Sequence, residues 1–228
     1  MMDLVIFDCD GVLIDSEVIS ARMLIAELAL HDVRIDTAYV ARHFLGRSYP
    51  TVLRQIRDEF GIHLPEGFEA AYRARLISAF RSDLVEVAGV RAVIAGLGVP
   101  YALATSSSPE RLGESLAIVG MADLFAGRCT TASEVANGKP APDLFLRVAE
   151  KYGVAPARCL VIEDSRAGVE AGLAAGMNVW RFTGGSHLAG LDLSLEEGPE
   201  PHRVFATYAD FFHLAPQLLK GDAHHEQG

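Results

Sequence analysis

Cysteine is scarce in this sequence of 228 residues, and no apolar run approaches the length of a membrane span. Cys9, Cys129 and Cys159 are odd in number and widely spaced, which argues against a disulfide framework or a zinc site. A span needs about 20 consecutive apolar residues. The first residues show neither the basic segment nor the cleavage site of a secretion signal. We therefore expect reduced, buried thiols in a cytoplasmic protein.

Positive charge is also in deficit. The formal net charge is −10 at pH 7, which argues against binding to nucleic acid or to an anionic membrane. Residues 16–84 carry nine arginines and nine acidic residues, so the net negative charge lies in the rest of the chain. An anionic substrate would need a cation to receive it there.

Apolar residues make up 50% of the chain and can fill a sizeable core. Their periodicity predicts a strand over 3–8, followed by helices over 16–31, 36–44, 50–60 and 66–80. Beyond residue 88, predicted helices (89–97, 109–119, 142–152, 165–176) alternate with predicted strands (99–105, 127–130, 158–164, 177–182). This alternation is typical of a parallel sheet between two layers of helices.

The first strand belongs to this sheet, although an all-helical block separates it from the second. The simplest arrangement is an α/β core of residues 1–15 and 85–228, with a helical domain of residues 16–84 inserted after the first strand. The fold predicted is thus a three-layer, Rossmann-like parallel sheet with a helical insertion. Residues 221–228 form a polar tail, in which His224 and His225 are expected to be solvated rather than metal-bound.

Polar side chains follow the predicted strands at the points where they end. Parallel sheets bind ligands at the carboxyl ends of their strands, so we expect these side chains to meet at one edge. Carboxylates and other oxygen ligands without soft donors suit Mg²⁺, which would offset the buried negative charge. The residues concerned are Asp8, Asp10, Thr105, Ser106, Ser107, Lys139, Glu163 and Asp164.

The spacing of the first two acids suggests separate tasks. Asp8 and Asp10 lie two residues apart, so in an extended strand they would share one face while Cys9 points into the packing. Gly11 would let the chain turn sharply and keep Asp10 over the same pocket. One carboxylate could then attack a substrate while the other transfers protons.

Four segments, DCDGVLIDSE, ALATSS, GKPAPDLF and VIEDSRAGVEAG, carry a family resemblance. In this order they resemble the four motifs of the haloacid dehalogenase-like hydrolases, and the resemblance spans roughly residues 3–182. More narrowly, the chain resembles the branch with a helical cap inserted after the first strand. That branch contains β-phosphoglucomutase and many sugar-phosphate phosphatases.

The resemblance implies catalytic roles for five residues. Asp8 is the expected nucleophile, which becomes an aspartyl-phosphate, and Asp10 protonates the leaving oxygen and then deprotonates the hydrolytic water. An aspartate at this second position indicates phosphate chemistry rather than dehalogenation. Thr105 and the Ser106 amide are expected to bond the transferring phosphoryl group, and Lys139 to neutralise charge between that group and Asp8.

The resemblance also implies Mg²⁺ as the cofactor. Asp8, the backbone carbonyl of Asp10 and Asp164 are its expected ligands, with Glu163 as a further ligand or as support behind them. Taken alone, some of these residues have simpler interpretations. The two acids after the first strand could form a solvated loop edge, Lys139 an exposed turn, and Thr105 a helix cap.

The inserted block offers candidates for substrate binding. The segment FLGRSYP, residues 44–50, lies between two predicted helices, where members of this branch present a loop to the substrate. Arg47 could bind an anionic or hydroxylated substrate tail, or could be a surface arginine in a turn. Tyr49 is a weaker candidate. Ser16, at the junction beside Glu17, is interpreted as a helix N-cap.

These features predict a Mg²⁺-dependent phosphatase acting on a small phosphorylated metabolite, a sugar or sugar-acid phosphate, beneath a closing cap. One alternative is a mutase of the β-phosphoglucomutase type, which uses the same aspartyl-phosphate. The arginine with which that mutase grips a second phosphate would align nearer Tyr49 than Arg47. A remote alternative is a phospho-receiver signalling domain, but such domains are much shorter and carry the phosphorylated aspartate on a later strand.

Overall fold

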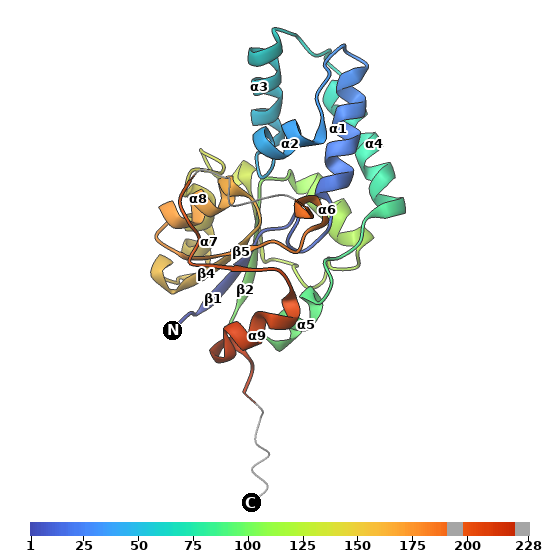
Figure 1. The fold of residues 1–228 in the computed structure, drawn as a ribbon. Helices are drawn as coiled ribbons and strands as arrows, with labels where there is room; N and C mark the ends of the chain where they lie inside the picture. Colours follow the sequence, from blue (N-terminus) through green and yellow to red (C-terminus); the bar gives the residue numbers. More distant parts are fainter. Residues whose placement is uncertain (191–197, 222–228) are drawn as a thin grey trace, which may run out of the picture.

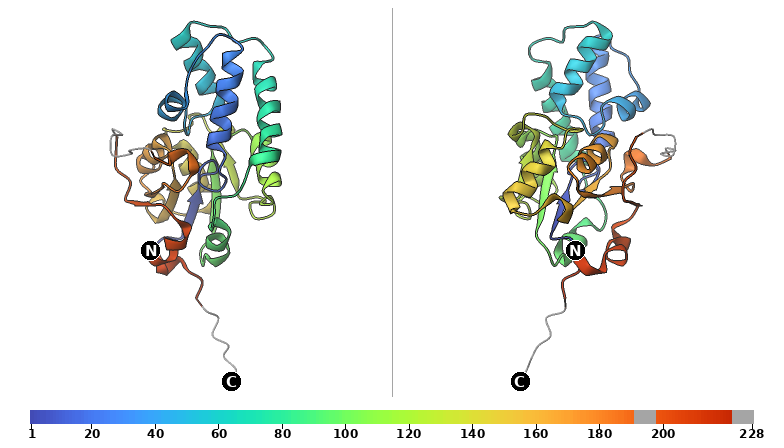
Figure 2. Two further views of the ribbon diagram at one scale, coloured as in Figure 1. Left: turned by 45° about the vertical axis from the view of Figure 1, so that its right-hand side comes forward. Right: turned by 90° about the vertical axis from the view of Figure 1, so that its left-hand side faces the viewer.

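The protein consists of an α/β core and a block of four helices that stands over one edge of it (Figure 1). This is a computed structural model, and it describes residues 1–190 and 198–221. Figure 2 shows the helical block above the core from two further directions.

Six parallel strands form the sheet, in the order β3-β2-β1-β4-β5-β6. From β1 the chain proceeds outward to β2 and β3, and then returns to the other side of β1 for the remaining strands. The carboxyl end of β1 is therefore the switch point at which such sheets bind ligands. The predicted α/β fold with a parallel sheet is confirmed. The strands are β1 Leu4–Phe7, β2 Tyr101–Thr105, β3 Cys129–Thr131, β4 Cys159–Glu163, β5 Asn178–Phe182 and β6 Arg203–Phe205.

Helices pack on both faces of the sheet, which gives the core its three layers. Helices α7 and α8 contribute to the apolar cluster on one face, and helices α5, α6 and α9 to the cluster on the other. The bounds of these helices are α5 Val90–Gly96, α6 Pro109–Ile118, α7 Asp143–Tyr152, α8 Arg166–Ala174 and α9 Phe211–Leu214.

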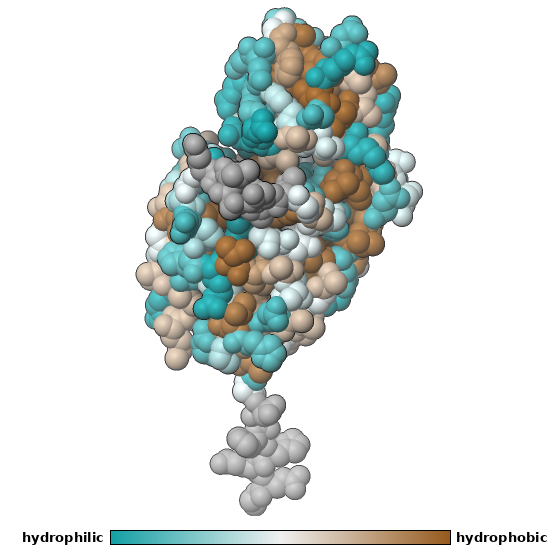
Figure 3. Space-filling model, in the orientation of Figure 1, coloured by the Kyte–Doolittle hydropathy of each residue, from teal (hydrophilic) through white to brown (hydrophobic). Residues whose placement is uncertain are grey.

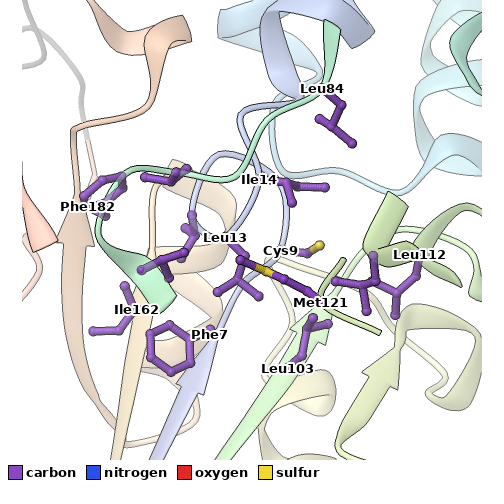
Figure 4. Close-up of a cluster of buried hydrophobic side chains, with 14 of the residues drawn as sticks. Phe7, Cys9, Leu13, Ile14, Leu84, Leu103, Leu112, Met121, Ile162 and Phe182 are labelled. Atoms are coloured by element: carbon purple, nitrogen blue, oxygen red, sulfur yellow. The ribbon is translucent and has the colours of Figure 1, made fainter. Parts of the chain in front are cut away.

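Strand β1 is apolar throughout because both of its faces are covered. Leu4 and Ile6 belong to the cluster of α7 and α8, whereas Val5 and Phe7 belong to the cluster of α5, α6 and α9. This is the alternation that a pleated strand requires. Figure 4 shows Phe7 beside Ile162 of β4 in this second cluster.

The first four of the five helices between β1 and β2, α1 to α4, form the cap, in the place predicted. Helices α1 and α4 pack against each other, and the apolar side chains of the cap join the cluster that contains Phe7. Cap and core thus share an apolar interior, while the exact limits of the cap at residues 16 and 84 stay a prediction. The helices are α1 Glu17–Ala29, α2 Thr37–His43, α3 Tyr49–Phe60 and α4 Phe68–Asp83.

The sequence analysis predicts no strand at the position of β6, Arg203–Phe205. Strand β6 is three residues long and lies at the sheet edge with Arg203 and Val204 exposed, so it shows no periodic pattern. Phe205 anchors it by edge-on ring contacts with Trp180 and Tyr208. Short 3₁₀ helices were also missed, namely η1 Ala132–Glu134, η2 Pro156–Arg158, η3 Ser186–Leu188, η5 Tyr208–Asp210 and η6 Pro216–Leu218. The predicted tail, with His224 and His225, lies outside the described residues except for residue 221.

Hydrophilic and hydrophobic side chains are interspersed over the face shown in Figure 3. Among the residues that the structure describes, no helix combines the length and the apolar character needed to cross a membrane. The three cysteines are free thiols; Cys9 and Cys159 are buried as predicted, whereas Cys129 is only partly buried.

Shortening Ile162 by one methyl group should destabilise the protein measurably. Its side chain is fully buried in β4, so Ile162→Val should lower the free energy of unfolding by about 0.5–1.5 kcal/mol. The matched control is Val85→Ala in the connection between cap and core, where the side chain is 58% exposed and the change should stay within about 0.5 kcal/mol. Urea unfolding monitored by circular dichroism measures both; equal losses would contradict tight packing around Ile162.

Candidate active site

The loop after β1 brings the first motif against the end of β4. The amide of Asp8 donates to the carbonyl of Ile162 at 2.9 Å, which continues the pairing of the two strands. Gly11 then turns the chain with a φ of 76°, and a Cβ atom at this position would lie 2.0 Å from Asp164 Oδ2. Glycine is therefore required both by the backbone conformation and by the close approach of Asp164.

A buried lysine joins two of the carboxylates. Lys139 Nζ lies 2.5 Å from Asp8 Oδ1 and 2.6 Å from Glu163 Oε1. Lys139 is 5% exposed, and Glu163 is fully buried. These distances are those of charge-assisted hydrogen bonds, in which the ammonium compensates part of the buried negative charge. Lys139 is not the exposed turn lysine of the simpler interpretation.

Helix α8 begins directly behind Glu163 and fixes its orientation. Glu163 Oε2 accepts from the amide of Ser165 at 2.8 Å and from its hydroxyl at 3.0 Å. A Cβ atom at Gly168 would lie 1.7 Å from Glu163 Oε1, so the glycine makes room for the carboxylate against the first turn of the helix. With Lys139 on the other oxygen, both oxygens of Glu163 are bonded within the protein.

Burial raises the pKa of Asp8 well above its usual value, although the ammonium of Lys139 opposes the rise. Burial likewise raises the pKa of Asp164, with a further contribution from the neighbouring Glu163. Burial alone would lower the pKa of Lys139, but Asp8 and Glu163 outweigh it and raise that pKa. Three carboxylates around one ammonium leave an excess of negative charge that a cation would relieve.

Asp8, Glu163 and Asp164 form an oxygen-rich group that could hold a metal ion. Each offers a carboxylate oxygen, and these atoms lie within 4.8 Å of one another. Asp164 Oδ2 is buried and accepts no hydrogen bond of good geometry, although His187 Nε2 lies 2.9 Å away. An unsatisfied carboxylate oxygen within a group of hard oxygen donors fits a small divalent cation.

Asp10 lies in a different environment from Asp8. Its Oδ1 accepts from the hydroxyl of Ser16 at 2.5 Å and from Arg111 Nη2 at 2.7 Å, and its Oδ2 accepts from the hydroxyl of Ser107 at 2.8 Å. Ser16 occupies the N-cap position of α1, but the predicted capping bond of its side chain is absent. Its hydroxyl instead orients the carboxylate of Asp10.

The residues after β2 line the same site. Thr105 is 1% exposed, and its hydroxyl accepts from the amide of Ser107 at 3.0 Å. It does not cap helix α6, because Ser108 occupies that position and accepts from the amide of Arg111. The hydroxyl of Ser106 donates to the carbonyl of Gly46 at 2.9 Å, which ties the core to the cap loop.

A cavity of about 290 Å³ lies between cap and core. Asp8, Asp10 and Thr105 line it from the core, whereas Arg47 and Tyr49 line it from the cap. Arg47 is an exposed side chain, but it lies on the cavity rather than on an unrelated surface. The hydroxyl of Tyr49 is buried without a hydrogen-bond partner, and its ring stacks on that of Tyr72 at 5.1 Å.

Two residues of the site carried no recognised signal in the sequence, and a third, Glu17, was noted only at the junction with the inserted helices. Arg111 lies in a polar first turn of α6, and His187 lies beyond the last recognised motif. Glu17 lines the cavity, and burial together with Asp10 raises its pKa to about 8. A glutamate beside a predicted helix start resembles any first-turn acid, so only the fold distinguishes it.

Comparison with known proteins identifies the family. A family model described as haloacid dehalogenase-like hydrolase matches residues 2–176. The chain belongs to this family. It is a haloacid dehalogenase-like phosphatase, a phosphoric monoester hydrolase, in the branch with a helical cap.

Two named phosphatases and one solved structure are similar to this chain. The chain is 27% identical to 6-phosphogluconate phosphatase of Escherichia coli (strain K12) over 82% of its own length and 85% of the relative's. It is 33% identical to hexitol phosphatase A of the same strain, over 76% and 80% of the two chains. A conserved haloacid dehalogenase-like protein of unknown function from Agrobacterium tumefaciens superposes with a TM-score of 0.76 at 31% identity, covering 95% of this chain and 99% of that one.

Removing the charge of Lys139 should destabilise the fold strongly. Lys139→Met would leave the carboxylates of Asp8 and Glu163 without their cation, at a cost of about 3–5 kcal/mol in the free energy of unfolding. Lys151→Met is the control, because its ion pair with Glu134 is partly exposed and should contribute at most about 1 kcal/mol. Urea unfolding in EDTA measures both without metal binding; a loss at Lys139 no larger than at Lys151 would refute the compensating role.

Proposed function

We propose that this phosphatase hydrolyses a sugar or sugar-acid phosphate with the help of Mg²⁺, through an aspartyl-phosphate on Asp8. The observation that carries the proposal is the contrast between two neighbouring carboxylates that line one cavity. Asp8 is bonded to a buried ammonium beside an acidic group, whereas Asp10 is bonded to hydroxyls and a guanidinium. The two phosphatase relatives support a phosphorylated sugar acid or hexitol as the class of substrate.

In the proposed first step, Asp8 attacks the phosphorus atom. The new bond joins Asp8 to phosphorus as the bond from phosphorus to the sugar oxygen breaks, and Asp10 donates a proton to that oxygen. Lys139 neutralises charge between Asp8 and the phosphoryl group, while Thr105 and the Ser106 amide bond its oxygens. Such positioning and charge compensation supply most of the catalysis in phosphoryl transfer.

In the second step, water attacks the phosphorus atom of the aspartyl-phosphate. Asp10, deprotonated by the first step, takes a proton from this water. The bond from phosphorus to Asp8 breaks, inorganic phosphate leaves, and the Asp8 carboxylate is regenerated. One residue thus serves as acid and then as base without an external proton carrier.

Asp8, Asp164 and the backbone carbonyl of Asp10 would hold Mg²⁺. Glu163 is better suited to support than to ligation, because Lys139 and Ser165 occupy its oxygens. A bound Mg²⁺ would neutralise the negative charge of the phosphoryl group and of the acidic cluster.

The cap would bind the part of the substrate that lies away from the phosphoryl group. Arg47 offers a forked donor for a carboxylate or for hydroxyls, and the unpartnered hydroxyl of Tyr49 offers a further hydrogen bond. A tyrosine where the mutase would carry its phosphate-gripping arginine favours hydrolysis over the mutase reaction.

Phosphate release should require both the metal and Asp8. With a panel of sugar, sugar-acid and nucleotide phosphates, we expect release in Mg²⁺, none in EDTA, and a loss of more than about 10³-fold in kcat for Asp8→Asn. Asp123→Asn, on an exposed surface, should retain full activity. Near-native turnover by Asp8→Asn would refute the nucleophile, and conversion of glucose 1-phosphate to glucose 6-phosphate with little free phosphate would identify a mutase.

The metal site can be tested without turnover. Asp164→Asn keeps the shape of the side chain but removes its charge, and should weaken Mg²⁺ binding by at least about 10–100-fold in isothermal titration calorimetry. Glu170→Gln on helix α8, whose ion pair with Arg166 is partly exposed, should leave the affinity unchanged. Equal affinities for the two variants would show that the metal binds elsewhere.

A further inference from the structure

The side chain of Arg111 contacts both Asp10 of the core and two residues of the cap. Its backbone belongs to core helix α6, and its Nη2 donates to Asp10 Oδ1 at 2.7 Å and to the hydroxyl of Ser20 on cap helix α1 at 3.1 Å. The guanidinium also lies over the ring of Phe80 on cap helix α4, with Cζ 5.6 Å from the ring centroid. The side chain is 23% exposed, so most of it is enclosed by these partners.

The guanidinium of Arg111 is hydrogen-bonded to both oxygens of Asp10, to one directly and to the other through Ser107. Nη2 bonds Oδ1 directly, while Nη1 donates to the hydroxyl of Ser107 at 2.9 Å. That hydroxyl in turn donates to Asp10 Oδ2 at 2.8 Å. The planar fork of one arginine thereby fixes the rotation of the carboxyl plane, which neither a lysine nor a hydroxyl alone could do.

Cap contacts complete this arrangement. Ser20 and Phe80 both belong to the cap and both touch the guanidinium, so displacement of the cap would remove two of its partners. A second arginine, Arg81 of α4, also bridges cap and core through Glu114 of α6 at 3.4 Å, but it is 65% exposed. The two bridges span the same pair of helices, and Arg111 contacts Asp10 in addition.

We propose that Arg111 is a positioning residue, which orients the carboxyl group of Asp10 for proton transfer and does so fully only when Ser20 and Phe80 of the cap are packed against it. This inference rests on the proposed function, in which Asp10 is the acid and base. It links acid–base competence to closure of the cap, when bulk water is excluded. Placement errors of about 1 Å in such groups can cost about 10²-fold in rate.

The test uses leaving groups that differ in their need for a proton. The rate constant kcat/KM reports the first phosphoryl transfer, in which p-nitrophenolate leaves unprotonated whereas a sugar alkoxide needs a general acid. We compare p-nitrophenyl phosphate with two alkyl phosphates, a hexitol phosphate and 6-phosphogluconate. The variants are Arg111→Gln, Arg111→Lys and Asp10→Asn, with Arg81→Gln as the matched control.

Arg111→Gln should lower kcat/KM about 10–100-fold for both alkyl phosphates and less than about threefold for p-nitrophenyl phosphate. Asp10→Asn should show the same selectivity, Arg111→Lys should recover part of the loss, and Arg81→Gln should stay within about twofold of the wild type. Ser20→Ala should lower the alkyl-phosphate rates in the wild-type background but not in Arg111→Gln. Retained activity on the aryl ester also shows that each variant folds.

Three outcomes would overturn the inference while the wild type remains active. An equal loss on all three esters would mean that Arg111 only docks the cap. A rise in KM confined to 6-phosphogluconate would mean that Arg111 binds the substrate carboxylate directly. Unchanged rates would mean that Asp10 needs no such support. A wild type that releases phosphate from none of the esters would instead refute the proposed function.

Discussion

The contact of Lys139 with Asp8 and Glu163 is the interaction on which the site depends. Carboxylates buried at the end of a parallel sheet are unstable unless a cation compensates them, because their hydration is lost. One ammonium bonds two of them at 2.5 and 2.6 Å, and Asp164 adds a third acid to the group. Three carboxylates around one ammonium leave a net negative charge, and this charge favours the binding of a divalent cation.

Close packing of the backbone keeps these charges together. The loop at Gly11 and the helix at Gly168 approach Asp164 and Glu163 so closely that a methyl group at either glycine would overlap a carboxylate oxygen. The sheet also brings the motifs together, because β1 lies between β2 and β4 and its carboxyl end is adjacent to the residues that follow both strands. The order of strands therefore brings together segments more than 150 residues apart in the chain.

Two carboxylates only two residues apart acquire different chemistry from their surroundings. Asp8 faces an ammonium and other acids, whereas Asp10 faces two serine hydroxyls and a guanidinium that extends into the cap. In the proposed mechanism, this separation would let Asp8 act as the nucleophile and Asp10 as the proton carrier in one cavity. The cap is connected to Asp10 through Ser20 and Phe80, which both contact Arg111.

The sequence by itself determined the parallel α/β core, the place of the helical insertion and the convergence of Asp8, Asp10, Thr105, Lys139 and Asp164. These features follow from apolar periodicity and from motifs at strand ends, which are local along the chain. Only the tertiary structure decided that the Ser16 hydroxyl bonds Asp10 and does not cap its own helix. It also decided that Arg111 and His187 lie at the site, and that β6 is the edge strand of the sheet. The physical reason is that these contacts join residues through space, where side-chain direction and burial, rather than spacing, select the partner.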